Sequence, residues 1–214
     1  NTPHHHMTTT PILYSFRRCP YAMRARLALL SAGIRVELRE IVLRDKAPEF
    51  LVTSPTGTVP CLKTDKKIID ESLHIMAWAL AKNDPETLMQ QPAQAYELMA
   101  QCDGPFKHAL DRTKYKTRYP NENPEHHLKT ASDFLTTLND QLAPNLYGDS
   151  LKLADIAILP FVRQFAHIDQ TWFYAQPWPN LILWLDTFKA SDRFANIMPK
   201  YKKWETDDQP IYFP

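Results

Sequence analysis

The chain has 214 residues, 44% of them hydrophobic and 23% charged, which is enough apolar material for a sizeable core in one or two domains. A formal net charge of +1 gives no case for nucleic acid or an acidic membrane surface as partner. Three cysteines are too few for a disulfide scaffold, so a reducing, cytoplasmic location is expected. No apolar run approaches the length of a membrane span. Residues 1–6 resemble an expression-tag remnant before Met7 and are left out of the reasoning.

The first half of the chain alternates strand and helix patterns. The predicted segments are strands at 12–15 and 36–42, helices at 21–32 and 49–52, an extended segment at 58–62, a strand at 68–69 and a helix from about residue 70. Apolar residues in the first and last helices repeat with a period of 3.6 residues. The order β-α-β-α-β-β-α predicts an α/β domain over residues 8–83.

Cys19 lies where the first strand meets the first helix. Pro20 follows at the first helical position, where its missing N–H costs nothing. The unpaired N–H groups and the positive end of the helix dipole favour the thiolate, so we predict a lowered pKa for Cys19. Arg17, Arg18 and Arg24 add positive charge nearby. A free cysteine is more often a small buried hydrophobe, but this position favours a reactive thiol.

The second half shows no strand pattern. A polar segment at 83–92 is the predicted boundary, and residues 92–214 are expected to form an all-helical domain. The predicted helices are a long one from about residue 93, kinked at Gly104-Pro105, one through 128–142, a buried one at 153–166 and amphipathic ones at 178–189 and 192–198. The polar, aromatic tail at 201–214 is expected to wrap back over the surface.

Other candidate residues favour structural roles. Cys61 and Cys102 fall on apolar strand and helix patterns and are predicted to lie in the core. His126 and His127 have no nearby cysteine or spaced carboxylate pair, so a solvated surface is favoured there and no metal site is predicted.

The strand order with Cys19-Pro20-Tyr21-Ala22 at its first turn resembles the thioredoxin fold. Thr58-Val59-Pro60 resembles the cis-proline motif of its glutathione-binding members. Glu71-Ser72 resembles their γ-glutamyl site, and Lys46 matches a lysine that binds the glycine carboxylate. Together these motifs resemble the cytosolic glutathione S-transferase family, nearest to its bacterial, omega-like and glutaredoxin-like cysteine branch. The resemblance implies glutathione as co-substrate and a homodimer.

Simple chemistry is consistent with the implied site. A cis Val59-Pro60 bond turns backbone groups outward, where a peptide such as glutathione can pair as an added strand. Glu71 offers an acceptor for an amino group, and Ser72 offers a donor for a carboxylate at a helix N-terminus. The structural alternatives are helix-terminal charge for Glu71, a cap for Ser72 and a solvated loop charge for Lys46.

The implied reaction is a monothiol cycle, because Ala22 replaces the resolving cysteine of dithiol glutaredoxins. Tyr14 and Ser15 lie near the place where other branches of the family carry a catalytic hydroxyl, and Cys19 is preferred to both. A transferase in which glutathione itself attacks electrophiles, and a non-catalytic binding protein of the same fold, remain alternatives. The candidate walls of the second-substrate site, expected between the domains, are Phe106, Tyr115, Tyr119 and Trp172.

Overall fold

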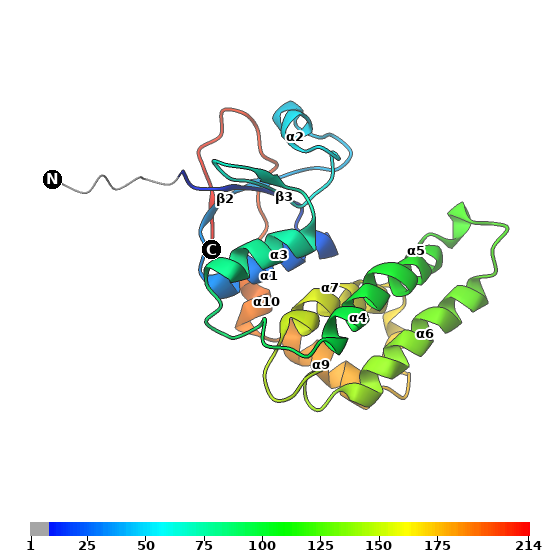
Figure 1. Ribbon diagram of the computed structural model, residues 1–214. Helices are drawn as coiled ribbons and strands as arrows, with labels where there is room; N and C mark the ends of the chain where they lie inside the picture. Colours follow the sequence, from blue (N-terminus) through cyan, green and yellow to red (C-terminus); the bar gives the residue numbers. More distant parts are fainter. Residues whose placement is uncertain (1–8) are drawn as a thin grey trace. The chain divides into compact units, whose positions relative to one another are not determined.

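The computed structural model describes residues 9–214, so the tag-like residues 1–6 lie outside the described range. The described chain divides into two compact units, residues 9–85 with 196–214 and residues 86–195. A mixed sheet with helices makes up the first unit, and the second is helical. This confirms the predicted fold class, a thioredoxin-like α/β domain followed by an all-helical region (Figure 1). None of the helices in residues 9–214 has the length and apolar character needed to cross a membrane.

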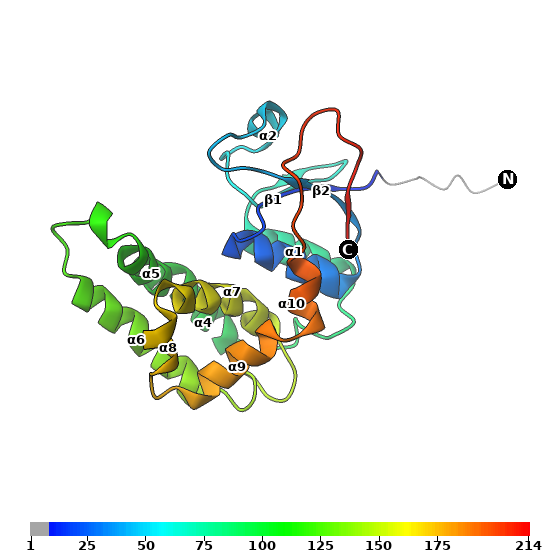
Figure 2. The ribbon, with the colours of Figure 1, turned by 180° about the vertical axis from the view of Figure 1, so that it is seen from behind.

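The sheet of the first unit has the strand order β4-β3-β1-β2-β5. Its elements are β1 (Ile12–Ser15), α1 (Pro20–Ala32), β2 (Val36–Glu40), α2 (Pro48–Thr53), β3 (Cys61–Lys63), β4 (Ile68–Ile69), α3 (Ser72–Lys82) and β5 (Tyr212–Phe213). β1 is central, parallel to β2 and antiparallel to β3, with Tyr14 opposite Cys61. α1 and α3 lie side by side on one face of the sheet (Figures 1 and 2). The end of β1 and the start of α1 therefore meet at one edge of this layer.

β2 is shorter than the predicted strand at 36–42. The Ile41 N–H still donates to the Ser15 carbonyl at 2.8 Å, which continues the parallel ladder by one bond. Val42 then turns away and forms an isolated bridge with Asp45. Val42 is apolar and was predicted to continue the strand, but it lies in a turn.

The C-terminal segment, residues 196–214, packs with the first unit rather than with the helices. β5 pairs antiparallel with β2, placing Phe213 opposite Val36, and the Trp204 N–H donates to the Glu40 carbonyl at 2.9 Å. The tail does fold back, but as a fifth strand that pairs with the backbone N–H and C=O groups at the outer edge of β2. The predicted helical domain at 92–214 is therefore too long at its C-terminal end.

The helices of the second unit are α4 (Gln94–Gln101), α5 (Lys107–Lys114), α6 (Pro124–Gln141), α7 (Leu153–Ile168), α8 (Gln170–Tyr174), α9 (Pro179–Lys189) and α10 (Asp192–Ile197), whose last residues belong to the first unit. The buried helix α7 contacts α4, α5, α8 and α9. A π-helical turn, η1 (Cys102–Phe106), joins α4 to α5 and contains Pro105, so the predicted kink is a π-bulge. A short 3₁₀ turn, η2 (Lys116–Arg118), follows α5.

α7 begins with half of a capping box. The Asp155 carboxylate accepts from the Lys152 N–H at 2.8 Å, the Leu146 N–H at 3.0 Å and the Trp184 Nε1 at 3.1 Å. The Lys152 side chain has no acceptor to offer and instead donates to the Thr87 carbonyl at 3.0 Å. Burial raises the pKa of Asp155 although its three donors oppose the shift.

Candidate active site around Cys19

Cys19 is the N-cap of α1, and it is partly exposed. Its extended backbone (φ −71°, ψ 121°) brings the chain out of the strand, and its carbonyl accepts the Met23 N–H at 2.9 Å. The Cys19 side chain does not cap the helix, so its sulfur is left for other contacts. Sγ lies 4.0 Å from the Val59 carbonyl oxygen, and the Val59-Pro60 peptide is cis, as predicted. The structure thus brings Cys19, Val59 and Pro60 together.

The other two cysteines lie in the core, as predicted. Cys61 and Cys102 are fully buried. Burial raises the pKa of Cys61 to about 11, so that thiol stays protonated at neutral pH. Ala22 is also buried, so the position of a resolving thiol is filled by a methyl group inside α1.

The hydroxyls of Tyr14 and Ser15 already have partners. Both side chains are buried at the end of β1. The Tyr14 hydroxyl accepts from Arg39 Nη1 at 3.0 Å, and the Ser15 hydroxyl accepts from Arg26 Nη1 at 2.7 Å. These contacts turn both groups into structural acceptors and favour Cys19 as the reactive group.

Arg26 is the residue near Cys19 that sequence reasoning missed. It sits in the second turn of α1, and its side chain reaches the end of β1, the loop at 16–18 and the C-terminal segment. An arginine among small and apolar helix positions gave no signal for this, because its partners lie far along the chain. The predicted contributors behave differently: Arg17 Nε donates to the Met198 carbonyl at 2.9 Å, Arg24 contacts Ser72, and Arg18 is exposed.

Glu40, at the end of β2, is the acidic partner of the same loop. Its Oε1 accepts the Arg17 N–H at 2.6 Å, while its buried Oε2 accepts no hydrogen bond from the described residues. Burial raises the pKa of Glu40, although the Arg17 N–H and the positive charges of Arg26 and Arg17 act against the shift.

Glu71 and Ser72 stand at the start of α3. Glu71 is the N-cap, is exposed and makes no side-chain capping bond. Ser72 is the first helical residue, is 7% exposed, and its hydroxyl accepts from Arg24 Nη1 at 3.4 Å. The structural alternative of a serine cap is therefore wrong, since Ser72 does not occupy the cap position.

Lys46 lies in the loop before α2 and is partly exposed. Its neighbour Asp45 forms an ion pair with Lys203 of the C-terminal segment. The ion pair of Asp45 thus links the loop that carries Lys46 to the C-terminal segment.

The four residues predicted to line a second-substrate site lie in different environments. Phe106 is fully buried against Phe134 and Phe165, with ring centroids 4.8 and 5.7 Å away, so it is a core residue of the helical unit. Tyr115 and Tyr119 lie under the guanidinium groups of Arg118 and Arg112, respectively. Trp172 lines a cavity of about 450 Å³ in the same unit, together with Phe165, Ile168, Leu128 and the start of α6. The apolar helix face that carries Phe106 packs inside its own unit. Helix periodicity alone cannot tell such a core-facing side from one that lines a substrate site.

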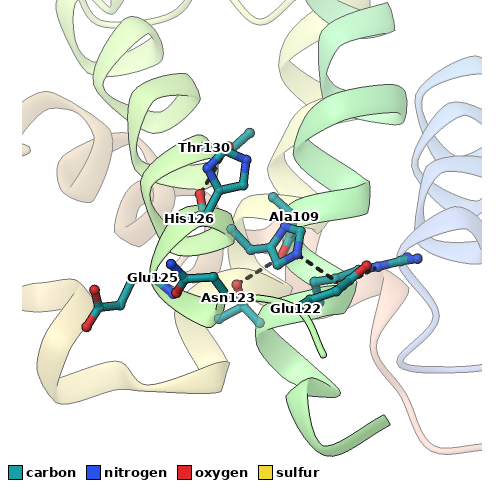
Figure 3. Close-up of polar contacts among 9 residues, drawn as sticks. Ala109, Glu122, Asn123, Glu125, His126 and Thr130 are labelled. Atoms are coloured by element: carbon teal, nitrogen blue, oxygen red, sulfur yellow. Dashed lines mark hydrogen bonds and ion pairs between the residues drawn. The ribbon is translucent and has the colours of Figure 1, made fainter. Parts of the chain in front are cut away.

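A cluster of polar contacts lies at the start of α6, with Glu122, Asn123 and His126 among its members (Figure 3). Glu122 Oε2 lies 3.0 Å from His127 Nε2 and 3.3 Å from Arg112 Nε, while the His126 carbonyl accepts from Thr130. Asn123 caps the helix through the Glu125 N–H. Within residues 9–214, no three histidine, cysteine or acidic side chains group closely enough to hold a metal ion.

Two family models match the chain in the order of its two regions. Residues 13–87 match the model described as glutathione S-transferase, N-terminal domain, and residues 98–187 match the corresponding C-terminal domain. The probable glutathione S-transferase parA of Nicotiana tabacum is 26% identical over 203 residues, covering 88% of this chain and 89% of the relative. Glutathione S-transferase omega-1 of Rattus norvegicus is 26% identical over 196 residues, covering 86% and 80%.

A solved structure has the same fold. The glutathione transferase Omega 3C from Trametes versicolor superposes with a TM-score of 0.75 at 20% identity, covering 92% of this chain and 87% of the other. The two family models together account for well over half of the residues, and the chain belongs to the glutathione S-transferase family.

Proposed function

We propose that the protein is a glutathione-dependent thiol transferase of the cysteine-type branch, with Cys19 as nucleophile. The observation that most supports this is the position of Cys19: a partly exposed thiol at the N-terminus of α1, 4.0 Å from the Val59 carbonyl. A helix N-terminus favours the thiolate, which is the nucleophilic form. Glutathione itself is supported by the family and by a related structure whose name records two bound glutathione molecules.

The proposed cycle is two thiol–disulfide exchanges. The Cys19 thiolate attacks the glutathione sulfur of a mixed disulfide; an S–S bond forms to Cys19, and the other thiol leaves as a thiolate that takes up a proton. A second glutathione thiolate then attacks the Cys19–glutathione disulfide, releasing oxidised glutathione and regenerating the Cys19 thiolate. Ala22 offers no second thiol, so the cycle is monothiol.

In this proposal, glutathione is held by backbone and side-chain groups of the first unit. Val59, beside the cis Pro60, would pair with the peptide backbone, and Ser72 with Glu71 would hold the γ-glutamyl group. Lys46 would bind the glycine carboxylate. We further propose a homodimer in the cytoplasm, as the family resemblance implies.

The test is the intact mass of the protein after incubation with oxidised glutathione. We expect one glutathione adduct on the natural chain, none on Cys19→Ser, and an undiminished adduct on the matched control Cys102→Ser. Glutathione reductase-coupled activity on a mixed disulfide should stop in Cys19→Ser, because a serine hydroxyl is scarcely ionised at neutral pH.

Two other results would replace the proposal. Tight glutathione binding without an adduct, with conjugation of an aryl halide persisting in Cys19→Ser, would make the protein a conjugating transferase. Neither binding nor adduct would make it a non-catalytic binding protein of this fold.

A further inference from the structure

The Arg26 guanidinium lies inside the first unit, directly under the loop that leads to Cys19. The side chain is 1% exposed. Its contacts are Ser15 Oγ at 2.7 Å, the Phe16 carbonyl at 3.3 Å, the Arg17 carbonyl at 2.5 Å, the Ile197 carbonyl at 2.9 Å and Met198 Sδ at 4.0 Å. A fully buried arginine is rare unless its donors are satisfied, and here two of its contacts go to successive carbonyls of the loop at 16–18.

That loop sets the backbone of Cys19. The Phe16 carbonyl accepts the Cys19 N–H at 3.1 Å as well as Arg26 Nη1. The Arg17 carbonyl accepts Arg26 Nη2, and the Arg17 N–H donates to Glu40. The planar guanidinium fork spans two successive carbonyls, a geometry that a lysine ammonium cannot reproduce. Moving Arg26 would therefore release the turn from which Cys19 projects.

The charge of Arg26 acts on the thiol as well. Burial lowers the pKa of Arg26 to about 10, so it stays protonated at neutral pH, and the Cys19 and Glu40 charges attract it. Because a Coulomb attraction is mutual, the Arg26 charge in turn favours the Cys19 thiolate. The charged or titratable groups that face Arg26 are Cys19 and Arg17 from the loop, Glu40 from β2 and Tyr201 from the C-terminal segment.

We propose that Arg26 is the positioning residue for Cys19: it fixes the loop at 16–18 through two carbonyls and places a buried positive charge under the loop that leads to the thiol. The proposal rests on the assignment of Cys19 as the nucleophile. The C-terminal segment takes part, since Ile197 supplies one of the acceptors that orient the guanidinium.

The test is the pH dependence of Cys19 alkylation by iodoacetamide, followed by peptide mass, in Arg26→Met and Arg26→Lys. We expect the alkylation midpoint to rise by about 1 pH unit in Arg26→Met, the lower end of the effect of removing a nearby opposite charge. Arg26→Lys keeps the charge and should show a smaller rise. The control is Asn139→Ala, which removes the buried cap of α9 in the other unit and should lower the melting temperature without moving the midpoint.

An unchanged midpoint in folded Arg26→Met, or an equal shift in Asn139→Ala, would overturn the proposal. If Arg26→Met does not fold, Arg26→Lys decides: slower alkylation at a single pH supports the positioning role, and natural rates with a natural midpoint refute it. Because alkylation needs no glutathione, a chain that forms no glutathione adduct would refute the proposed function and leave this measurement intact.

Discussion

At the scale of single residues, some groups of the candidate site can be recognised from the sequence around them and others cannot. Cys19 and the Val59-Pro60 pair carry local signals, a helix start and an X–Pro step in an extended segment. Arg26 carries none, because its function depends on acceptors at Phe16 and, 171 residues away, at Ile197. Local patterns therefore pointed to the candidate thiol and missed the arginine that contacts the loop before it.

Ser72 offers a clean separation of binding from stability. It is the first residue of α3 and not its cap, so Ser72→Ala should change the melting temperature little. If its hydroxyl holds a charged part of glutathione, the lost bond is worth about 1.5–3 kcal/mol, which weakens binding by roughly ten- to a hundredfold. Calorimetric titration with glutathione beside a thermal melt measures both.

The matched control is Ser191→Ala. Ser191 does cap a helix, since its hydroxyl accepts the Phe194 N–H at 3.1 Å. Its loss should cost about 0.5–2 kcal/mol of stability and leave glutathione affinity unchanged. Natural affinity in Ser72→Ala would rule out its part in the γ-glutamyl site.

Glu40 predicts a pH dependence with a definite sign. Its pKa in the folded state is raised by burial, so the folded protein holds this proton more tightly than the unfolded chain, whose glutamate titrates near pH ~4.3. The contribution of protonated Glu40 to the free energy of unfolding is full below that pH. It is lost as the pH rises through the pKa of Glu40 in the folded state. The stability of the natural chain minus that of Glu40→Gln should therefore fall from about pH 4 toward neutral.

Urea unfolding of both proteins at a series of pH values measures this difference. Glutamine keeps the Oε1 acceptor for the Arg17 N–H, so the loop contact survives the substitution. A difference that stays level or grows with pH would contradict the raised pKa.

At the scale of elements, β5 is the piece that supports β2 from the far end of the chain. Leu38 donates to the Ile211 carbonyl at 2.7 Å, and Arg35 lies over the ring of Tyr212 at 4.0 Å. Without β5 the outer edge of β2 would expose unpaired backbone groups. The ladder that holds Glu40 in place would then end in solvent.

Removal of residues 210–214 should therefore increase amide hydrogen exchange at Leu38 and its neighbours in β2. Exchange in α7 of the helical unit should not change. The control Tyr212→Ala removes an exposed side chain and keeps the backbone pairing, so it should leave β2 protected. Equal exchange in the truncated and natural chains would mean that β5 contributes nothing to β2.

At the scale of the whole molecule, the order of elements followed from the sequence while the assignment of the tail did not. Strand and helix periods, the polar segment after Asn83 and the Gly104-Pro105 break each act within a few residues. The pairing of Val36 with Phe213 joins positions with no local signal for each other. The core position of Phe106 likewise depended on which face of a helix met its neighbours.

The contacts of the buried Arg26 guanidinium also have a consequence for the order in which the two units are completed during synthesis. During synthesis the helical unit, a continuous stretch at 86–195, is complete in the nascent chain before Ile197 is added. Until then Arg26 lacks one acceptor, and β2 lacks its outer neighbour. The unit that contains the first strands is therefore completed last, and a freshly made chain acquires all the contacts of Arg26 only when the tail pairs with the sheet.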